Sequence, residues 1–233
     1  MSENLILRSL PEEEHASLIV HATPVRLTQN DVIYESGGSI EHVYFLESGM
    51  VSLVTGRSGS AIATGVVGCE GLVGSKVVLG SPETHGQAVV HLGGHAIRMP
   101  APQFLQAYGQ LPSFTRLVNS HIGLLLFQAE QNALCHALHS IESRFCRWVL
   151  QAADRIDSNL LELTQESCSQ ILGVQRTSVS MVAHTLQLAG TIRTRRGKIE
   201  ILNRTSLENA ACECYGQVKE RFDAADSPYL EAA

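Results

Sequence analysis

The stretch QESCSQILGVQRTSVSMVAHTLQLA, residues 165–189, decides the fold of the C-terminal part of this chain. It predicts two helices separated by Gly173, which is free to adopt a positive φ in the turn between them. Relative to this glycine, small or apolar side chains occur at offsets −5, −4, −1, +1, +6 and +9, which are Cys168, Ser169, Leu172, Val174, Val179 and Val182. These offsets place the side chains on the facing sides of two helices that cross steeply. The pattern predicts a helix-turn-helix, with an ordinary helical hairpin inside a core as the alternative.

The second helix of this pair has an outward face that the internal packing does not require. A helix fits the major groove of B-DNA, and its first two turns reach base edges. Arg176 could bind guanine O6 and N7 together, while Gln175, Thr177 and Ser180 could donate to bases or phosphates. A solvated surface is an equally good interpretation for Met181 and His184. The DNA-binding residues expected on this helix are Gln175, Arg176, Thr177, Ser178, Ser180, Met181 and His184.

The segment TIRTRRGKIEIL, residues 191–202, directly follows the helix pair. Isoleucines alternate with polar residues on both sides of Arg196-Gly197, a pattern that predicts a short β-hairpin. A hairpin after a helix-turn-helix is a wing. We expect the cationic side chains near its tip, Arg195, Arg196 and Lys198, to meet the phosphate backbone of DNA.

Composition describes a globular chain with a local excess of positive charge. Of 233 residues, 44% are hydrophobic and 17% are charged, and the formal net charge is −6. The net charge alone argues against nucleic acid as a partner. Between residues 159 and 205, however, six basic residues accompany only three acidic ones. A local basic face is what phosphate binding requires.

The six cysteines are scattered along the chain and do not have the spacing of a disulfide framework. Cys212-Glu213-Cys214 is a lone CxC, which is more often a pair of incidental thiols than a metal or redox site, so no metal ligands are expected. The N-terminal residues lack a cationic region followed by an apolar run and a cleavage site. No apolar run reaches the length of a membrane span. We therefore expect a cytoplasmic, reduced protein that does not bind membranes.

The N-terminal part is expected to contain a helix and then a β roll. Residues 5–21 predict a short helix with acidic residues in its first turn. From about residue 25 to residue 100, short β-like runs alternate with glycine turns, at Gly37-Gly38, Ser48-Gly49, Ser58-Gly59 and Gly93-Gly94. Strands of this length and spacing predict an antiparallel roll or jelly roll, which Pro100 and Pro102 end.

A long helix is expected over residues 112–136. Its apolar stripe is formed by Phe114, Val118, Ile122, Leu125 and Ala129, and is widened by Leu117, Leu124 and Leu126. So broad an apolar surface needs more than one partner. These partners would be the β roll and the same helix of a second chain in a coiled-coil-like dimer, with a single buried helix as the alternative. Residues 139–156 predict a further helix that packs on the helix-turn-helix, and residues 136–138 predict the hinge before it.

The predicted order, in an α+β chain, resembles the Crp–Fnr family, which is named after the cyclic-AMP receptor protein and the fumarate–nitrate regulator. The matching segments are YFLESGMVSLV (44–54), GCEGLVG (68–74), LTQESCSQILGVQRTSVS (163–180) and RRGKIEIL (195–202). The resemblance covers nearly the whole chain and its C-terminal part is the more specific. It implies a cyclic-nucleotide-binding-like sensor roll (1–111), a dimerisation helix (112–136) and a winged helix-turn-helix (137–206), followed by a tail (207–233) without an assigned function.

The same resemblance implies a transcription regulator and not an enzyme. Its partners would be double-stranded DNA, a second copy of the chain and RNA polymerase. An effector at the roll would meet Gly68, Glu70, Gly71 and Glu130, and a signal there would shift the hinge.

Four departures from the family pattern change these expectations. Members that bind cyclic AMP have an arginine–serine pair after the glycine–glutamate pair, whereas the segment SPETHGQA (81–88) has no arginine for a cyclic phosphate. The positions that offer hydroxyl groups to the base correspond here to Ala129 and Glu130, so cyclic AMP binding is expected to be weak or absent. No cysteine precedes Cys69, so the N-terminal iron–sulfur cluster of oxygen-sensing members is not expected. Of the family pattern Arg-Glu-Thr-Val-x-Arg, the first arginine remains as Arg176, whereas the glutamate and the second arginine are absent, so the target sequence should differ.

A cupin-type metal enzyme is the competing hypothesis, because a jelly roll with histidines can hold a metal ion. The candidate ligands are His85, His91 and His95, but they lack the close spacing of such sites, and surface histidines are the simpler interpretation. No Ser/His/Asp set, phosphate-binding loop or dinucleotide motif occurs. A ligand-binding module without DNA output is a third possibility, which the wing argues against.

Overall fold

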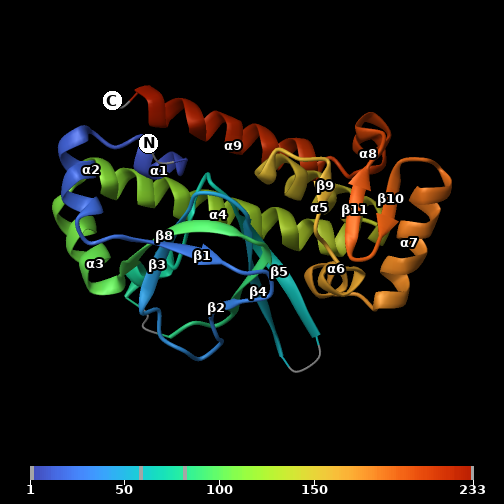
Figure 1. Ribbon diagram of the computed structural model, residues 1–233, viewed down its shortest axis with the longest axis horizontal. Helices are drawn as coiled ribbons and strands as arrows, with labels where there is room; N and C mark the ends of the chain where they lie inside the picture. Colours follow the sequence, from blue (N-terminus) through green and yellow to red (C-terminus); the bar gives the residue numbers. More distant parts are fainter. Residues whose placement is uncertain (1–2, 58–59, 81–82, 232–233) are drawn as a thin grey trace.

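The computed structural model describes residues 3–57, 60–80 and 83–231. Figure 1 shows a β-rich N-terminal part and a C-terminal part that contains the helix-turn-helix, with the long helix α4 running behind the β-rich part towards the C-terminal part. The α+β arrangement expected from the sequence is confirmed. The predicted turn at Ser58-Gly59 and residues 81–82 of the segment 81–88 lie outside the described residues.

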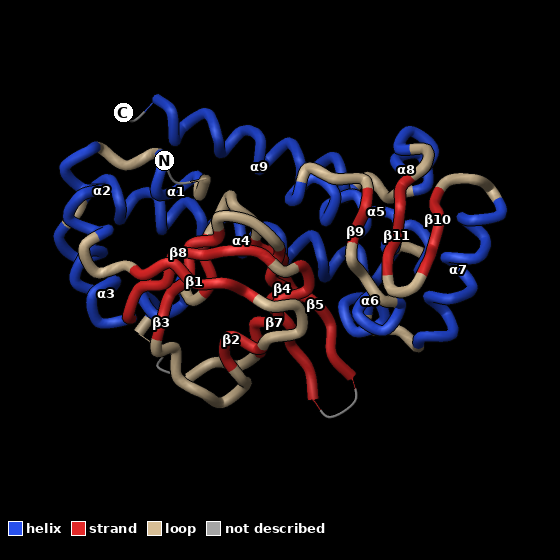
Figure 2. Tube along the Cα trace, in the orientation of Figure 1, coloured by secondary structure: helices blue, strands red, loops and turns tan. Residues whose placement is uncertain are grey.

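The N-terminal part is an antiparallel roll of two facing sheets. In the described part of the chain, one sheet has the strand order β1–β8–β3–β6 and the other has the order β2–β7–β4–β5. The first contains β1 (Thr23–Leu27), β3 (His42–Leu46), β6 (Leu72–Val73) and β8 (Gly94–Pro100). The second contains β2 (Val32–Tyr34), β4 (Met50–Arg57), β5 (Ser60–Val67) and β7 (Gln87–Leu92). Figure 2 shows the two sheets stacked, so the predicted roll is confirmed.

Apolar side chains from both sheets fill the space between them. The buried set includes Leu46 and Ala96 from the first sheet and Val51, Val67 and Val90 from the second. This packing follows from the period of two along each strand, which sends alternate side chains inward.

The turn between β3 and β4 requires a glycine. Gly49 has a φ of 86°, and a Cβ atom there would collide with the carbonyl oxygens of Leu92 and Gly93. The turn predicted at Ser48-Gly49 is therefore present for a physical reason.

Short helices cover one end of the roll. The single helix expected over residues 5–21 is two helices, α1 (Leu5–Arg8) and α2 (Glu12–Ile19), because Pro11 lies between them and forms the N-cap of α2. A 3₁₀ turn, η1 (Ser75–Leu79), and α3 (Ala101–Gln110) complete the cover. Pro102 lies in the first turn of α3, where a missing N–H costs nothing. The last strand of the roll ends at Pro100, as expected, and Pro102 in addition lies where α3 begins.

Helix α4 (Pro112–Leu138) is longer than predicted, and the predicted hinge at residues 136–138 is its last turn. The break falls instead at His139 and Ser140, whose backbones are extended. Ser140 then caps α5 (Ile141–Ile156), because its hydroxyl oxygen accepts the N–H of Ser143 at 3.1 Å. The cap explains why the new helix begins two residues later than the sequence suggested.

The C-terminal part is a winged helix-turn-helix followed by two further helices. It contains α6 (Gln165–Leu172), α7 (Arg176–Leu188) and a sheet of β9 (Leu160–Leu161), β10 (Ile192–Arg195) and β11 (Lys198–Ile201). After the wing come α8 (Arg204–Ala210) and α9 (Cys214–Glu231). In Figure 1, α9 runs back along α4 towards α1, and it contacts both helices.

Among the described residues, every helix is too short or too polar to traverse a lipid bilayer.

Candidate nucleic-acid interface

The helix-turn-helix forms as its sequence pattern predicts. Cys168, Leu172 and Val179 are buried at the crossing of α6 and α7, in one core with α5 and the wing. Thr164 caps α6 by accepting the N–H of Ser167 at 3.0 Å. Gly173 ends α6 with a φ of 61°, the left-handed conformation that favours glycine.

The turn of the helix-turn-helix also rests on the β roll. A Cβ atom on Gly173 would overlap the side chain of Ile62 in β5, and α6 and β5 are in contact. Nearby, the Gln29 amide donates to the carbonyl oxygens of His91 and Glu162, which joins the roll to the segment before α6. The helix-turn-helix is therefore held against the β roll.

The outward face of α7 leaves most of the predicted contact residues accessible. The exposed ones are Gln175, Arg176, Thr177, Met181 and His184. Ser178 and Ser180 are half-buried. The Ser180 hydroxyl donates to Gln165 Oε1 at 2.6 Å and to the carbonyl oxygen of Arg176 at 3.0 Å. The Ser180 hydroxyl thus forms hydrogen bonds within the protein, which could not be predicted from its position in the sequence.

The wing is a tight hairpin whose tip is Arg196-Gly197, both with positive φ. Two of its cations are already neutralised, because Arg193 pairs with Glu200 at 2.9 Å and Lys198 with Glu162 at 2.5 Å. The side chains of Arg195 and Arg196 are exposed and form no ion pair with a described residue.

A groove of about 440 Å³ lies between the wing and the start of α7. It is lined by Arg176 on one side and by the segment 194–199 on the other, with the N-terminus of α6 at its base. The structure thus brings Arg176, Arg195, Arg196 and Lys198 to one concave surface. Exposed guanidinium groups and a helix N-terminus favour the binding of phosphates.

Three of the four residues that the family resemblance implied for an effector, Gly68, Glu70 and Gly71, contact other parts of the chain itself. The Glu70 carboxylate accepts from Arg155 Nε of α5 at 2.8 Å and from the Gly68 N–H at 3.1 Å. Both side chains of the ion pair are mostly buried, at 14% and 8% exposure. A Cβ atom on Gly71 would overlap the ring of His121 in α4. Sequence reasoning missed these partners because they lie far along the chain.

His121 is buried and neutral beside this segment. Its Nε2 lies 2.9 Å from the carbonyl oxygen of Leu72, to which it donates as the neutral tautomer, and its Nδ1 has no hydrogen-bond partner among the described residues. Burial lowers the pKa of His121 to about 4, although the Leu72 carbonyl and the Glu70 charge oppose the shift.

Glu130 lies apart from the other three residues within one protomer. Gln128 and Asn132 of α4 face β5, where they hydrogen-bond to the backbone of Val66 and Thr64. Glu130, between them in sequence, is exposed on the other side of α4.

The histidines of the cupin hypothesis do not converge either. His91 is buried against Trp148, with ring centroids 6.3 Å apart, whereas His85 and His95 are exposed. Within the described residues, the one group of side chains with metal-ligand spacing contains none of the three.

Comparisons with known proteins agree with the geometry. The model of the Crp-like helix-turn-helix domain matches residues 143–210, and the model of the cyclic nucleotide-binding domain matches residues 24–110. The comparison with curated proteins finds no relative whose sequence matches this chain.

Solved structures show the same fold at low sequence identity. FixK2 from Bradyrhizobium japonicum is 18% identical and has a TM-score of 0.70, over 82% of this chain and 98% of its own. TTHA1359 from Thermus thermophilus, a transcriptional regulator of the CRP/FNR family, is 21% identical with a TM-score of 0.68, over 81% and 98% of the two chains. The c-di-GMP-responsive global regulator CLP from Xanthomonas campestris is 14% identical with a TM-score of 0.68, over 82% and 99%.

The two domain models match in the order roll then helix-turn-helix, and together they span most of the chain. Because a roll of the cyclic nucleotide-binding type is joined through α4 and α5 to a Crp-like helix-turn-helix, the chain belongs to the Crp–Fnr family and has the fold of its transcription regulators.

Proposed function

We propose that the chain is a sequence-specific transcription regulator that binds an inverted-repeat DNA site as a homodimer. The observation that carries this proposal is the cationic groove between α7 and the wing. Arg176 would contact guanine O6 and N7 in the major groove, while Arg195 and Arg196 would contact phosphates. Two such heads related by a two-fold axis would enter major grooves roughly 34 Å apart.

An exposed apolar surface on α4 supports the homodimer. Leu126, Leu134 and Leu138 are 62%, 40% and 72% exposed, on the part of α4 that does not face the roll. A second α4 packed there would cover these side chains in a parallel helix pair. Glu130 of each chain would then lie at this interface, close to the partner protomer.

The dimer proposal is tested by the change Leu134→Glu. A charge on this surface should shift the protein from dimer to monomer in analytical ultracentrifugation, because a buried unpaired carboxylate is costly. Leu79→Glu, at another exposed leucine outside α4, is the matched control. A Leu134→Glu protein that sedimented like the wild type would contradict the proposed interface.

The DNA-binding proposal is tested by comparing Arg176→Ala with Arg196→Ala. Selection of bound duplexes from a random library would first define the site. The Arg176→Ala protein should lose about 1–3 kcal/mol of discrimination at one base position, because a bidentate base contact is removed. The Arg196→Ala protein should bind all sequences more weakly, and the salt dependence of binding should fall by about one unit.

Arg116→Ala is the control for these variants, because Arg116 is an exposed arginine on α4 outside the groove. It changes the net charge equally and should leave both quantities unchanged. If Arg176→Ala and Arg196→Ala had the same effect on base preference and salt dependence, the assigned roles would be wrong.

We further infer that cyclic AMP is not the signal. The Glu70 carboxylate is occupied by Arg155, His121 contacts Gly71, and the segment 83–88 offers no arginine. Isothermal titration calorimetry with cyclic AMP should therefore detect no binding, and a saturable heat would contradict this inference. Any effector that binds the roll at this place would have to displace the ion pair between Glu70 and Arg155 or bind to it.

A further inference from the structure

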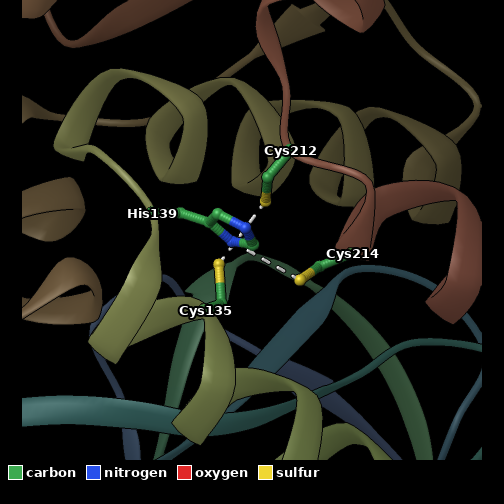
Figure 3. Close-up of side chains that lie close together, drawn as sticks. All are labelled: Cys135, His139, Cys212 and Cys214. Atoms are coloured by element: carbon green, nitrogen blue, oxygen red, sulfur yellow. Dashed lines mark hydrogen bonds between the residues drawn. The ribbon is translucent and has the colours of Figure 1, made fainter.

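Three thiols and one imidazole meet at the junction of α4, α5 and α9. Cys135 lies in the last turn of α4, and His139 lies at the break before α5. Cys214 is the first residue of α9, and Cys212 lies two residues before it. Figure 3 shows the four side chains pointing towards a common centre from these separate elements. Their ligand atoms all lie within 4.8 Å of one another. The three cysteines are buried, and they form a small cluster of their own.

The spacing of these atoms fits one tetrahedral metal ion. Cys135 Sγ lies 3.5 Å from Cys212 Sγ, and Cys214 Sγ lies 3.6 Å from His139 Nδ1. In a tetrahedral zinc site, the bond lengths give sulfur–sulfur edges of about 3.8 Å and sulfur–nitrogen edges of about 3.5 Å. An iron–sulfur cubane attaches each thiolate to a different iron atom and needs a wider set of ligands. The geometry therefore favours a mononuclear site.

The second nitrogen of His139 has the partner that metal-binding histidines usually have. His139 Nε2 lies 3.1 Å from Glu213 Oε1, and Glu213 stands between the two cysteines of the CxC. Because a carboxylate accepts hydrogen bonds, this contact places the ring proton on Nε2 and leaves the Nδ1 lone pair directed at the thiols. A carboxylate that orients a histidine in this way is typical of zinc sites.

Buried positive charges lie next to the cluster and lack a paired anion among the described residues. Arg144 and Arg147 of α5 are only 7% and 4% exposed, and neither forms a salt bridge within the described part of the chain. Arg147 donates to Asn132 Oδ1 at 2.7 Å, but its Nε and Nη1 atoms find no hydrogen-bond partner in the part of the chain that the structure describes. Arg147 also lies close enough to interact electrostatically with all three cysteines of the cluster.

A zinc ion bound by three thiolates and a neutral imidazole has a net charge of −1. Such a centre would offset a buried guanidinium, whose burial without an anion is costly. The unpaired arginines are thus a second observation, independent of the ligand spacing, that points to a thiolate centre at this place.

We propose that Cys135, His139, Cys212 and Cys214 bind one Zn²⁺ ion in a structural site that fastens the start of α9 to the break between α4 and α5. Binding replaces the thiol protons with the metal ion and releases them to solvent, and no electron transfer is involved. The ligand set C-x₃-H and C-x-C is closed, with four protein ligands and no open position, as in structural zinc sites. The site would fix the geometry of the break that separates the dimer helix from the reading head.

The first test is the metal content of the full-length protein. Wild-type protein, freed of metal under reducing conditions and titrated with Zn²⁺ against a chromophoric chelator, should bind one ion per chain. Cys212→Ser and His139→Ala should each lower the affinity by at least tenfold, because one ligand of four is lost. Cys69→Ser is the matched control, since it removes a thiol outside the cluster and should bind zinc like the wild type.

Glu213→Gln separates positioning from ligation. The amide keeps the shape of the side chain but removes its charge, so the stoichiometry should remain one ion per chain and the affinity should fall about 10–100-fold. An affinity equal to that of the wild type would show that the contact with His139 does not orient the ring, and would remove that part of the argument.

Cobalt substitution reports the geometry of the site without depending on any variant. Wild-type protein loaded with Co²⁺ should show thiolate-to-cobalt charge transfer in the near ultraviolet and the intense visible bands of tetrahedral Co²⁺. Absence of both, together with no stoichiometric Zn²⁺ binding, would overturn the proposal. Iron with acid-labile sulfide in anaerobically purified protein, or a Cys135–Cys212 disulfide that persists under reducing conditions, would overturn it as well.

Discussion

Acidification should destabilise this protein through two buried histidines, His91 and His121. The two residues are 2% and 1% exposed, and burial lowers the pKa of each to about 4 from an ordinary value of 6.5. Among the described residues, both nitrogens of His91 and Nδ1 of His121 have no hydrogen-bond partner, so a proton gained there would lie in an apolar environment. The folded protein therefore keeps both rings neutral at a pH where the unfolded chain already protonates them.

The sign and the size of the effect follow from proton linkage. Above pH 6.5 both states are neutral and the histidines cost nothing. As the pH falls from 6.5 to 4, the unfolded chain binds more protons, so the free energy of unfolding falls by up to about 1.4 kcal/mol per pH unit for each histidine. Between pH 7 and pH 5, the loss is about 2 kcal/mol for each ring and about 4 kcal/mol for the pair. Below pH 4 these two groups cause no further loss.

Urea unfolding at a series of pH values measures this loss, and Trp148 provides the signal. It is the single tryptophan of the chain, it is buried, and it lies edge-on to His91. His91→Phe keeps an aromatic ring against Trp148 and removes the titrating group, so the slope of stability against pH between 4.5 and 6 should fall by about 1.4 kcal/mol per unit. His95→Phe, at an exposed histidine on β8, is the control for loss of an imidazole. A His91→Phe protein with the wild-type slope would refute the reasoning.

Three further substitutions test how the parts are joined. Gly173→Ala should destabilise the protein by about 1–3 kcal/mol, because the position has a positive φ and the new methyl group overlaps Ile62; Ile62→Ala should restore part of the loss in thermal unfolding. Arg155→Met should cost about 3 kcal/mol by leaving the Glu70 carboxylate buried and unpaired, and the combined change with Glu70→Gln should cost less than the sum of the two single changes in a double-mutant cycle. Thr164→Ala removes the N-cap of α6 and should lower stability by about 1 kcal/mol in urea unfolding, with no such loss for Thr164→Ser.

Local patterns in the sequence predicted the fold well wherever they were strong. The helix-turn-helix is predicted by the spacing of residues around Gly173, and the wing by an alternating pattern around Arg196-Gly197. Each element can therefore be predicted from one short segment of sequence. The break after α4 was placed too early, because nothing between Cys135 and Leu138 interrupts a helix and the decisive signal is the cap at Ser140.

The thiol cluster could not be inferred from sequence for a different reason. Cys212 and Cys214 alone form a CxC without further ligands nearby, and the other two ligands are more than 70 residues away. Only the path of α9 back along α4 brings them together. The residues next to Cys212 and Cys214 in the sequence therefore predict only a pair of incidental thiols.

Helix α5 shows how charged residues connect the roll to the helix-turn-helix. Arg144, Arg147 and Arg155 would ordinarily predict a solvated helix face, yet all three point into the protein. Arg155 pairs with Glu70 of the roll, Arg147 donates to Asn132 of α4, and Arg144 donates to the carbonyl oxygen of Leu172 at the end of α6.

The same helix contributes Phe145, Trp148 and Val149 to the core that it shares with α7. A ligand that displaced Glu70 would therefore release one end of a helix whose other contacts hold both α4 and the recognition helix. Packed cores shift between discrete arrangements and do not deform continuously. Such a release would therefore change the orientation of the helix that carries Arg176. The buried arginines thus lie between the roll and the helix-turn-helix, where a signal would have to pass if the proposed function holds.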